Sequence, residues 1–195
     1  MKKLYISTKN KNKLKELSRM LGDDIELLHP GEDDEDVEET GVTLWENALL
    51  KANVGFERSG VPTIADDTGI EVDALNGGPG VYSARYAGED ATYEDNCRKL
   101  LQEMKGVAEE QRGARFRTVI AYVDGQSEPR RFDGIVEGRI ITSNRGEGGF
   151  GYDPVFEVEG TEKTMAEMGS DEKNAISHRG NALRAFVKWW EENKG

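Results

Sequence analysis

The order in which apolar residues change their spacing is the feature that most constrains the fold of this chain. In the first half, short apolar runs typical of strands, at residues 4–6 and 25–28, alternate with stretches in which apolar residues recur every three to four positions. Later, two β-branched runs at residues 116–123 and 132–141 follow each other with only a turn around Gly125 between them. We therefore expect an α/β fold with a mixed sheet and flanking helices.

Local signals predict the remaining elements. Thr43 and Glu46 have the spacing of a capping box, so we expect a helix to begin there and to continue through Ala48 and Ala52. The other predictions are strands at residues 62–65, 70–75 and 155–158 and helices at residues 14–21, 92–104 and 182–192.

Composition limits the classes of partner. The chain has 195 residues, which favours one domain, and its formal net charge of −12 repels nucleic acid and anionic membranes at long range. A small phosphorylated substrate stays compatible with this charge if lysines, backbone amides or a divalent metal meet the phosphate locally. Cys97 is the single cysteine, which excludes an internal disulfide and a multi-cysteine zinc site and is typical of the reducing cytoplasm. We expect neither a membrane-spanning helix nor a secretory signal.

The segment STKNKNK at residues 7–13 lies between a predicted strand and a predicted helix. The free N–H groups of a helix N-terminus, together with Lys9, Lys11 and Lys13, suit a bound phosphate. The alternative is a polar loop in which Asn12 is an ordinary N-cap.

Two further segments contain charged residues beside glycine. DDTG at residues 66–69 follows a predicted strand, where carboxylates can hold Mg²⁺ and orient a water, although Asp and Gly also favour a tight turn. NGGPG at residues 76–80 is followed by Arg85, which either meets an anion or makes a structural salt bridge.

The last two segments contain aromatic and basic residues. GEGGFGYD at residues 146–153 formally fits G-x-G-x-x-G, but a strand rather than a helix is expected after it, so we reject a dinucleotide site. Its aromatic rings suit contact with a flat heterocycle instead. In KNAISHR at residues 173–179, His178 and Arg179 offer donors to a base carbonyl or a phosphate. In the structural alternative, Ser177 caps the last helix and the two basic residues make a surface salt bridge.

These segments, in this order, resemble the inosine triphosphate pyrophosphatase family, also called XTP/dITP diphosphatases. The resemblance covers nearly the whole chain and is carried by VEETGVTLWENALLKA (37–52), ADDTGIEVDALNGGPGVYSARYAGE (65–89), GGFGYDPVF (148–156) and EKNAISHR (172–179). It implies hydrolysis of non-standard purine nucleoside triphosphates, such as ITP, dITP and XTP, to the monophosphate and pyrophosphate with Mg²⁺ as the cofactor. It also implies that residues 1–195 form a single domain, with a twisted mixed sheet in two lobes around a central cleft, and that the enzyme is a cytoplasmic homodimer that cleanses the nucleotide pool.

The resemblance assigns roles by position. Asp67 matches the base that activates water and also a metal ligand, and Glu38 matches a second metal ligand, with Glu39 as the alternative. The implied substrate-binding residues are Thr8, Lys9, Asn10, Lys11, Asn12 and Lys13 for the triphosphate, Lys51 and Thr68 for the phosphates and the substrate, and Phe150, Gly151, Tyr152, Asp153, Lys173, His178 and Arg179 for the base and the sugar.

The sequence departs from the family pattern in three places. Lys9 stands where the family commonly has Gly, Thr68 stands where Ser is common, and the acidic run at residues 31–39 is not a family hallmark. Three other functions stay open at this stage: a Maf-like pyrophosphatase of pyrimidine triphosphates, a nucleotide-binding regulator without catalysis, and a structural protein.

Overall fold

The computed structural model describes residues 2–21 and 25–193. One sheet has the strand order β2-β1-β3-β4-β5-β6; β1 pairs in parallel with β2 and β3, and β5 pairs antiparallel with β6. The α/β fold with a mixed sheet and flanking helices is therefore confirmed. The strands are β1 (Lys2–Ile6), β2 (Ile25–Leu28), β3 (Thr63–Val72), β4 (Gly113–Val123), β5 (Arg130–Ile140) and β6 (Phe156–Val158), and the α-helices are α1 (Lys11–Leu21), α2 (Leu44–Ser59), α3 (Tyr93–Glu103), α4 (Ser170–Ile176) and α5 (His178–Glu192).

Helix α2 begins where the capping box predicts. The Thr43 side chain accepts a hydrogen bond from the Glu46 backbone N–H, and the Glu46 carboxylate accepts one from the Thr43 N–H. Gly60 ends the helix in the left-handed conformation that favours glycine. These caps fix where α2 begins and ends, and therefore which way its residue Lys51 points.

The prediction of two strands around a turn at DDTG is wrong. β3 runs without interruption from Thr63 to Val72 and includes Asp66, Asp67, Thr68 and Gly69. The turn preference of Asp and Gly is overridden because both carboxylates find cationic partners on opposite faces of the strand. The chain leaves the strand at a 3₁₀ turn, Asp73–Leu75, rather than continuing as strand to residue 75.

The chain divides into two compact units. The first contains Met1–Asp67, Thr118–Gly134 and Arg179–Gly195, and the second contains Thr68–Arg117 and Ile135–His178. The expectation that residues 1–195 form a single two-lobed domain stays a prediction. Among the described residues, no helix combines the length and the apolar character needed to cross a bilayer.

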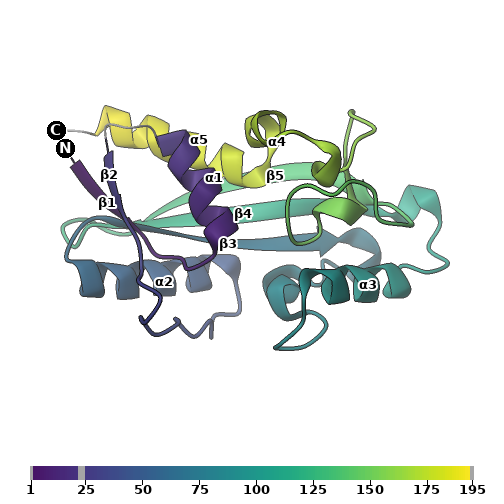
Figure 1. The fold of residues 1–195 in the computed structure, drawn as a ribbon, viewed down its shortest axis with the longest axis horizontal. Helices are drawn as coiled ribbons and strands as arrows, with labels where there is room; N and C mark the ends of the chain where they lie inside the picture. Colours follow the sequence, from purple (N-terminus) through teal and green to yellow (C-terminus); the bar gives the residue numbers. More distant parts are fainter. Residues whose placement is uncertain (1, 22–24, 194–195) are drawn as a thin grey trace. The chain divides into compact units, whose positions relative to one another are not determined.

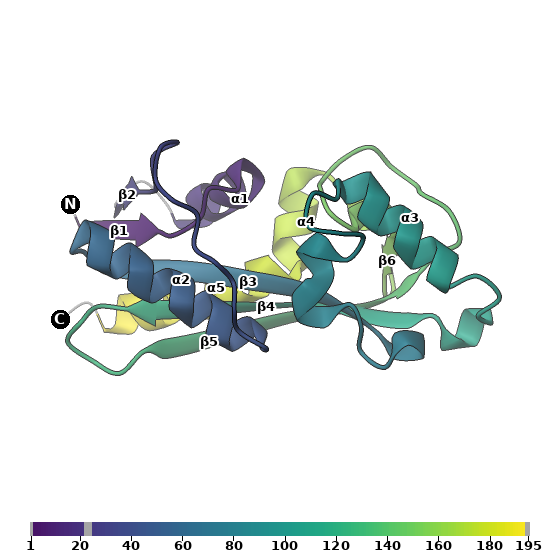
Figure 2. The same cartoon turned by 90° about the horizontal axis from the view of Figure 1, so that it is seen from below.

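In the first unit, helices cover both faces of the strands (Figure 1). Figure 2 shows α2 on the near face and α5 beyond the strands. Successive strand residues point to opposite faces, so β3 places Ile64 in a cluster with residues of α1 and α5 and places Ala65 in a cluster with Ala48 and Ala52 of α2. The small alanines let α2 lie close to the sheet.

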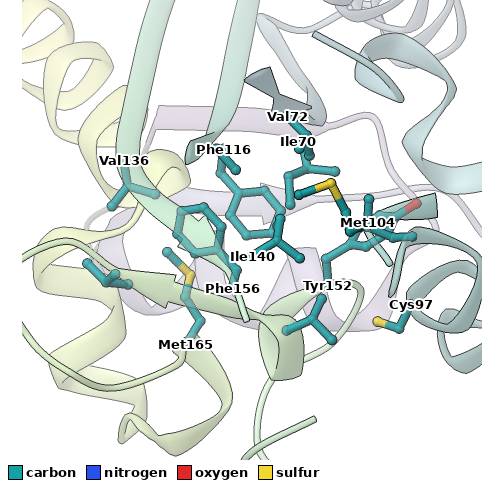
Figure 3. Close-up of a cluster of buried hydrophobic side chains, with 14 of the residues drawn as sticks. Ile70, Val72, Cys97, Met104, Phe116, Val136, Ile140, Tyr152, Phe156 and Met165 are labelled. Carbon is teal, nitrogen blue, oxygen red and sulfur yellow. The ribbon is translucent and has the colours of Figure 1, made fainter. Parts of the chain in front are cut away.

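The second unit has its own apolar core (Figure 3). The rings of Phe116 and Phe156 pack there with centroids 4.7 Å apart, α3 contributes Cys97, and Met104 follows at the end of that helix. Met165 packs on the same cluster, and its unbranched side chain fits irregular space. Tyr152, which directly follows the glycine-rich segment 146–151, belongs to this core and anchors the end of the segment to it.

Gly55 allows α2 to approach the end of β1. A Cβ at this position would lie 2.8 Å from the Cβ of Ser7 and 2.9 Å from Thr63 Cγ2. Gly55→Ala should therefore lower the free energy of unfolding by about 1–3 kcal/mol, because either the helix or the strand must shift. The measurement is urea unfolding, with Asn53→Ala on the exposed face of the same helix as the control. An unchanged midpoint for Gly55→Ala would show that this close approach is not limiting.

Candidate active site

The carboxyl end of β1 is the place where the first unit gathers charged side chains. From β1 the chain passes through α1 to β2 on one side and returns through α2 to β3 on the other, so the connections diverge at β1. Such switch points are where open α/β sheets bind ligands. β1 ends at Ile6, level with Ile64, so Asp66 and Asp67 lie just past its end.

The loop after β1 presents the N-terminus of α1. The alternative in which Asn12 is the N-cap is wrong, because the Asn10 Oδ1 accepts from the backbone N–H of Asn12 at 3.0 Å and of Lys13 at 3.3 Å. The Thr8 hydroxyl in turn accepts from the Asn10 N–H at 3.2 Å. Lys11 and Lys13 thus lie in the first turn, where the helix dipole disfavours cations and favours a bound anion.

Asp66 is the centre of a buried ion cluster on one face of β3. Its Oδ2 lies 3.0 Å from the Lys13 Nζ and accepts from the Arg179 Nε at 3.1 Å. Arg179 also contacts Glu16 of α1. Burial alone raises the pKa of Asp66, but Lys13 and Arg179 reverse this and hold the pKa well below its ordinary value. We call Glu16, Lys13, Asp66 and Arg179 the Asp66 cluster.

Asp67 points to the other face, toward α2. The Lys51 Nζ donates to the Asp67 Oδ1 at 2.9 Å and to the Glu39 Oε1 at 2.6 Å, and the Asn47 amide donates to the Asp67 Oδ2 at 3.5 Å. Burial raises the pKa of Asp67, and Lys51 offsets only part of the rise. Burial lowers the pKa of Lys51, but Asp67 and Glu39 outweigh it and leave that pKa raised. We call Glu39, Asn47, Lys51 and Asp67 the Asp67 cluster.

The two candidate metal-binding glutamates differ in position. Glu39 is half-buried and reaches the same ammonium as Asp67, whereas Glu38 is exposed. The geometry thus favours Glu39, the alternative at the sequence level, as the carboxylate beside Asp67.

The Asp67 cluster fits a divalent metal in its donor chemistry. Two carboxylate oxygens, from Glu39 and Asp67, converge on one cation, the Lys51 Nζ. Within the described part of the chain, no group of three or more His, Cys, Asp or Glu side chains could hold a metal ion. Mg²⁺ commonly takes one or two protein carboxylates and completes its shell with water and substrate phosphates, so two carboxylates suffice.

In the second unit, Asp153 closes the glycine-rich segment 146–151. Its Oδ2 accepts from the Phe150 backbone N–H at 2.8 Å and from the Lys173 Nζ at 2.7 Å. Gly149 adopts φ +73°, and a Cβ there would lie 2.0 Å from the same oxygen. A 3₁₀ turn, Asp153–Val155, and then β6 follow, so the rejection of a dinucleotide fingerprint agrees with the structure.

Phe150 is positioned as a half-buried aromatic surface. The Lys173 Nζ lies 4.9 Å from the centre of its ring, and the ring of Tyr93 lies 5.9 Å away at a tilt of 44°. Tyr152, by contrast, is only 4% exposed, and its hydroxyl donates to the Ser83 carbonyl at 2.7 Å. The Tyr152 ring thus belongs to the core of the second unit, and its expected contact with the base stays a prediction.

His178, Thr68 and Arg85 are partly or fully buried. His178 stacks on Phe116 with ring centroids 4.6 Å apart, and Thr68 is half-buried in β3. Arg85 lies 3.9 Å from Glu89 and over the ring of Tyr82, so the structural role that we left open for it is present.

Sequence reasoning missed several members of the two clusters, namely Asp66, Glu16 and Asn47. The pairing of two adjacent aspartates in a strand was the available signal for Asp66, since alternate strand residues face opposite sides. Glu16 and Asn47 lie in predicted helices, where the sequence pattern indicates only that they belong to a polar face. Their place in the two clusters follows from the tertiary structure alone.

Comparisons with known proteins agree with the fold of this chain. The sequence profile of the Ham1 family matches residues 4–189. A dITP/XTP pyrophosphatase of Bacillus anthracis is 49% identical over 94% of this chain and 94% of its own length, and one of Caldanaerobacter subterraneus subsp. tengcongensis is 50% identical over 99% of this chain and 100% of its own. The structure of the Staphylococcus aureus Ham1 protein superposes with a TM-score of 0.89 at 40% identity, over 98% of this chain and 99% of that one.

Asp66→Asn tests the Asp66 cluster. The substitution removes the carboxylate that faces both Lys13 and Arg179, so the free energy of unfolding at pH 7 should fall by about 3–5 kcal/mol. Because the folded pKa of Asp66 lies below the unfolded pKa, its contribution is complete above about pH 5 and declines below about pH 4. Urea unfolding of both proteins from pH 7 to pH 3 should thus show a shrinking difference. A difference independent of pH would contradict this assignment, and exposed Asp33→Asn is the control.

Proposed function

The chain belongs to the Ham1 family, and on that premise we propose that it hydrolyses non-standard purine nucleoside triphosphates, such as ITP, dITP and XTP, to the monophosphate and pyrophosphate. Its relatives at 49–50% identity are named dITP/XTP pyrophosphatases, and the similarity extends over nearly the full length of each chain. The family of nucleotide pyrophosphatases generally uses a divalent metal, and we propose Mg²⁺ as that metal here.

One observation carries the proposal: Asp66 and Asp67 each engage a lysine from a different helix just past the end of β1. The Lys13 Nζ comes from α1 and the Lys51 Nζ from α2, and the N-terminus of α1 opens at the same strand end. A protein with a net charge of −12 thereby concentrates ammonium groups and helix N–H groups at one place. This is the chemistry that a triphosphate requires.

We assign the phosphate chain to Thr8, residues 10–13 and Lys51. The Thr8 and Asn12 side chains donate to phosphate oxygens, and the positive end of the α1 dipole attracts the phosphate charge. Burial lowers the pKa of Lys13, and Asp66 offsets part of this by attraction, so an arriving phosphate competes with Asp66 for the same ammonium. Asp66 therefore keeps Lys13 oriented before the substrate arrives.

We assign activation of the attacking water to Asp67. A bound Mg²⁺ held by Glu39 and Asp67 would neutralise phosphate charge and lower the pKa of a coordinated water. Burial raises the pKa of Asp67, which makes its carboxylate a better proton acceptor than an exposed one. A water oxygen beside the Asp67 carboxylate attacks the α-phosphorus, its proton passes to that carboxylate, and pyrophosphate leaves with the electrons of the broken P–O bond.

We assign recognition of the purine to the second unit. Phe150 offers an aromatic face, and Lys173, His178 and backbone N–H groups offer donors for the 6-oxo group of hypoxanthine or xanthine. Adenine presents an amine at that position and would leave a buried donor facing a donor, which costs about 1–3 kcal/mol. We further propose that the protein acts in the cytoplasm as a homodimer.

The reaction class is tested by the products. With Mg²⁺, ITP and XTP should give the monophosphate and pyrophosphate, while ATP, UTP and dTTP should react far more slowly. Chromatography of the nucleotide products and a pyrophosphate-specific assay follow both products. Preference for UTP or dTTP would favour a Maf-like enzyme, and tight nucleotide binding without pyrophosphate release would favour a regulator.

Asp67→Asn should lower kcat for ITP at least about a hundredfold, because the amide keeps the shape of the side chain but accepts no proton. Nucleotide binding, measured by calorimetry, should weaken much less. Asp73→Asn, which changes a half-exposed carboxylate of the second unit, is the matched control. Turnover of Asp67→Asn within a few-fold of the parent would remove Asp67 from the chemistry.

Lys173→Met should reduce the preference for ITP over ATP, expressed as the ratio of kcat/KM values, by about tenfold. The ratio is the informative quantity, because any loss of stability from removing the ion pair between Lys173 and Asp153 affects both substrates alike. Lys163→Met, in an exposed lysine of the same unit, should leave the ratio unchanged. If the Lys173→Met ratio also stays unchanged, the donor to the 6-oxo group lies elsewhere.

A further inference from the structure

Contacts with lysine and arginine side chains, rather than a helix or strand, hold the acidic run at residues 31–39 in position. Seven of its nine residues are Asp or Glu, and no helix or strand is present between the described residues 31 and 39. A segment with this charge repels itself and, without counter-charges, would extend into solvent. We call residues 31–39 the acidic strap.

Lys9 makes the densest set of contacts with this strap. Its Nζ donates to the backbone carbonyls of Asp34 and of Glu32, the latter at 3.4 Å, and it lies 3.2 Å from the Asp36 carboxylate. Two of the three partners are main-chain oxygens, so the contact fixes the path of the strap and not only its charge. Two other cations add weaker support: Lys11 lies 3.7 Å from Glu32, and Arg58 donates to the Glu35 carbonyl at 2.8 Å.

The far end of the strap carries the carboxylate of the candidate metal site. Glu39 is its last residue and reaches the Lys51 Nζ at 2.6 Å, which also holds Asp67. The strap is therefore attached at Lys9, in the loop after β1, and again beside Asp67. A loosening at the first attachment lets the Glu39 carboxylate sample more positions at the second.

Lys9 is accommodated without backbone strain. Among the described residues, the non-glycine positions with positive φ are Asn76 and Glu162, so position 9 does not need the conformational freedom of glycine. The sequence departs from the family pattern at Lys9 and at the acidic run. In the structure these two departures contact each other.

We propose that Lys9 is a positioning residue: it ties the acidic strap to the phosphate-binding loop and so holds Glu39 beside Asp67. This inference rests on the proposed function only for its catalytic consequence; the tie itself is a property of the ligand-free protein. The alternative role, a direct phosphate ligand, is the one that the sequence suggests for Lys9.

The first test measures the strap without nucleotide or metal. A glutamate-specific protease is added to native protein, and the initial rate of cleavage within residues 31–39 is followed by mass spectrometry. The Asp36 side chain is 85% exposed, and exposed ion pairs are weak, so Lys9→Met should raise the cleavage rate by about two- to fivefold. Lys9→Arg should restore most of the protection, since the guanidinium still donates to carbonyl oxygens.

Two substitutions within the strap separate the tie from net charge. Asp36→Asn should raise the cleavage rate less than Lys9→Met, because the two carbonyl contacts remain. Asp33→Asn removes the same charge at an exposed strap residue that none of these contacts uses, and it should leave the rate at the parent value. An unchanged rate in Lys9→Met, or an equal increase in Asp33→Asn, would overturn the proposal.

The second test measures the catalytic consequence. In Lys9→Met, the Mg²⁺ concentration that gives half-maximal pyrophosphate release from ITP should rise by about the same factor as the cleavage rate. A rise in the KM for ITP at saturating Mg²⁺, with the Mg²⁺ requirement and the cleavage rate unchanged, would show that Lys9 is a phosphate ligand instead. If the parent protein releases no pyrophosphate from any triphosphate, the proposed function fails, and the protease experiment still decides the tie.

Discussion

The divergence of two adjacent carboxylates from one strand is the constraint on which the candidate site depends. β3 turns Asp66 toward α1 and α5 and Asp67 toward α2, because consecutive side chains of a strand face opposite sides. Each buried carboxylate needs a cation, so each face must supply one. Lys13, Arg179 and Lys51 meet that need, and in doing so the fold gathers its phosphate-binding cations at one strand end.

This arrangement shifts the pKa values of the two aspartates in opposite directions. Two buried cations hold the pKa of Asp66 down, which suits a fixed counter-ion that orients Lys13 and Arg179. Asp67 has a single lysine and a neighbouring glutamate, and burial keeps its pKa raised, which suits proton transfer. Adjacent groups of one residue type thus acquire separate roles from their surroundings.

Much of the fold could be predicted from the sequence, and the failures have physical causes. The capping box at Thr43 and Glu46 located α2 because it is a local signal, whereas β3 was divided into two strands because the turn preference of DDTG is also local and was overridden by tertiary ion pairs. Asp67 could be singled out from the sequence, but the exposure that separates Glu38 from Glu39 could not. Tyr152 reads as a binding aromatic in its glycine-rich context, and only packing places its ring in the core.

The most direct test of the account is a crystal structure of the protein with Mg²⁺ and a non-hydrolysable analogue of ITP. The account predicts the phosphate chain at the N-terminus of α1, within hydrogen-bond distance of Lys13 and Lys51, with the metal held by Glu39 and Asp67. A phosphate chain bound away from the carboxyl end of β1, or a metal ligated without Asp67, would contradict it.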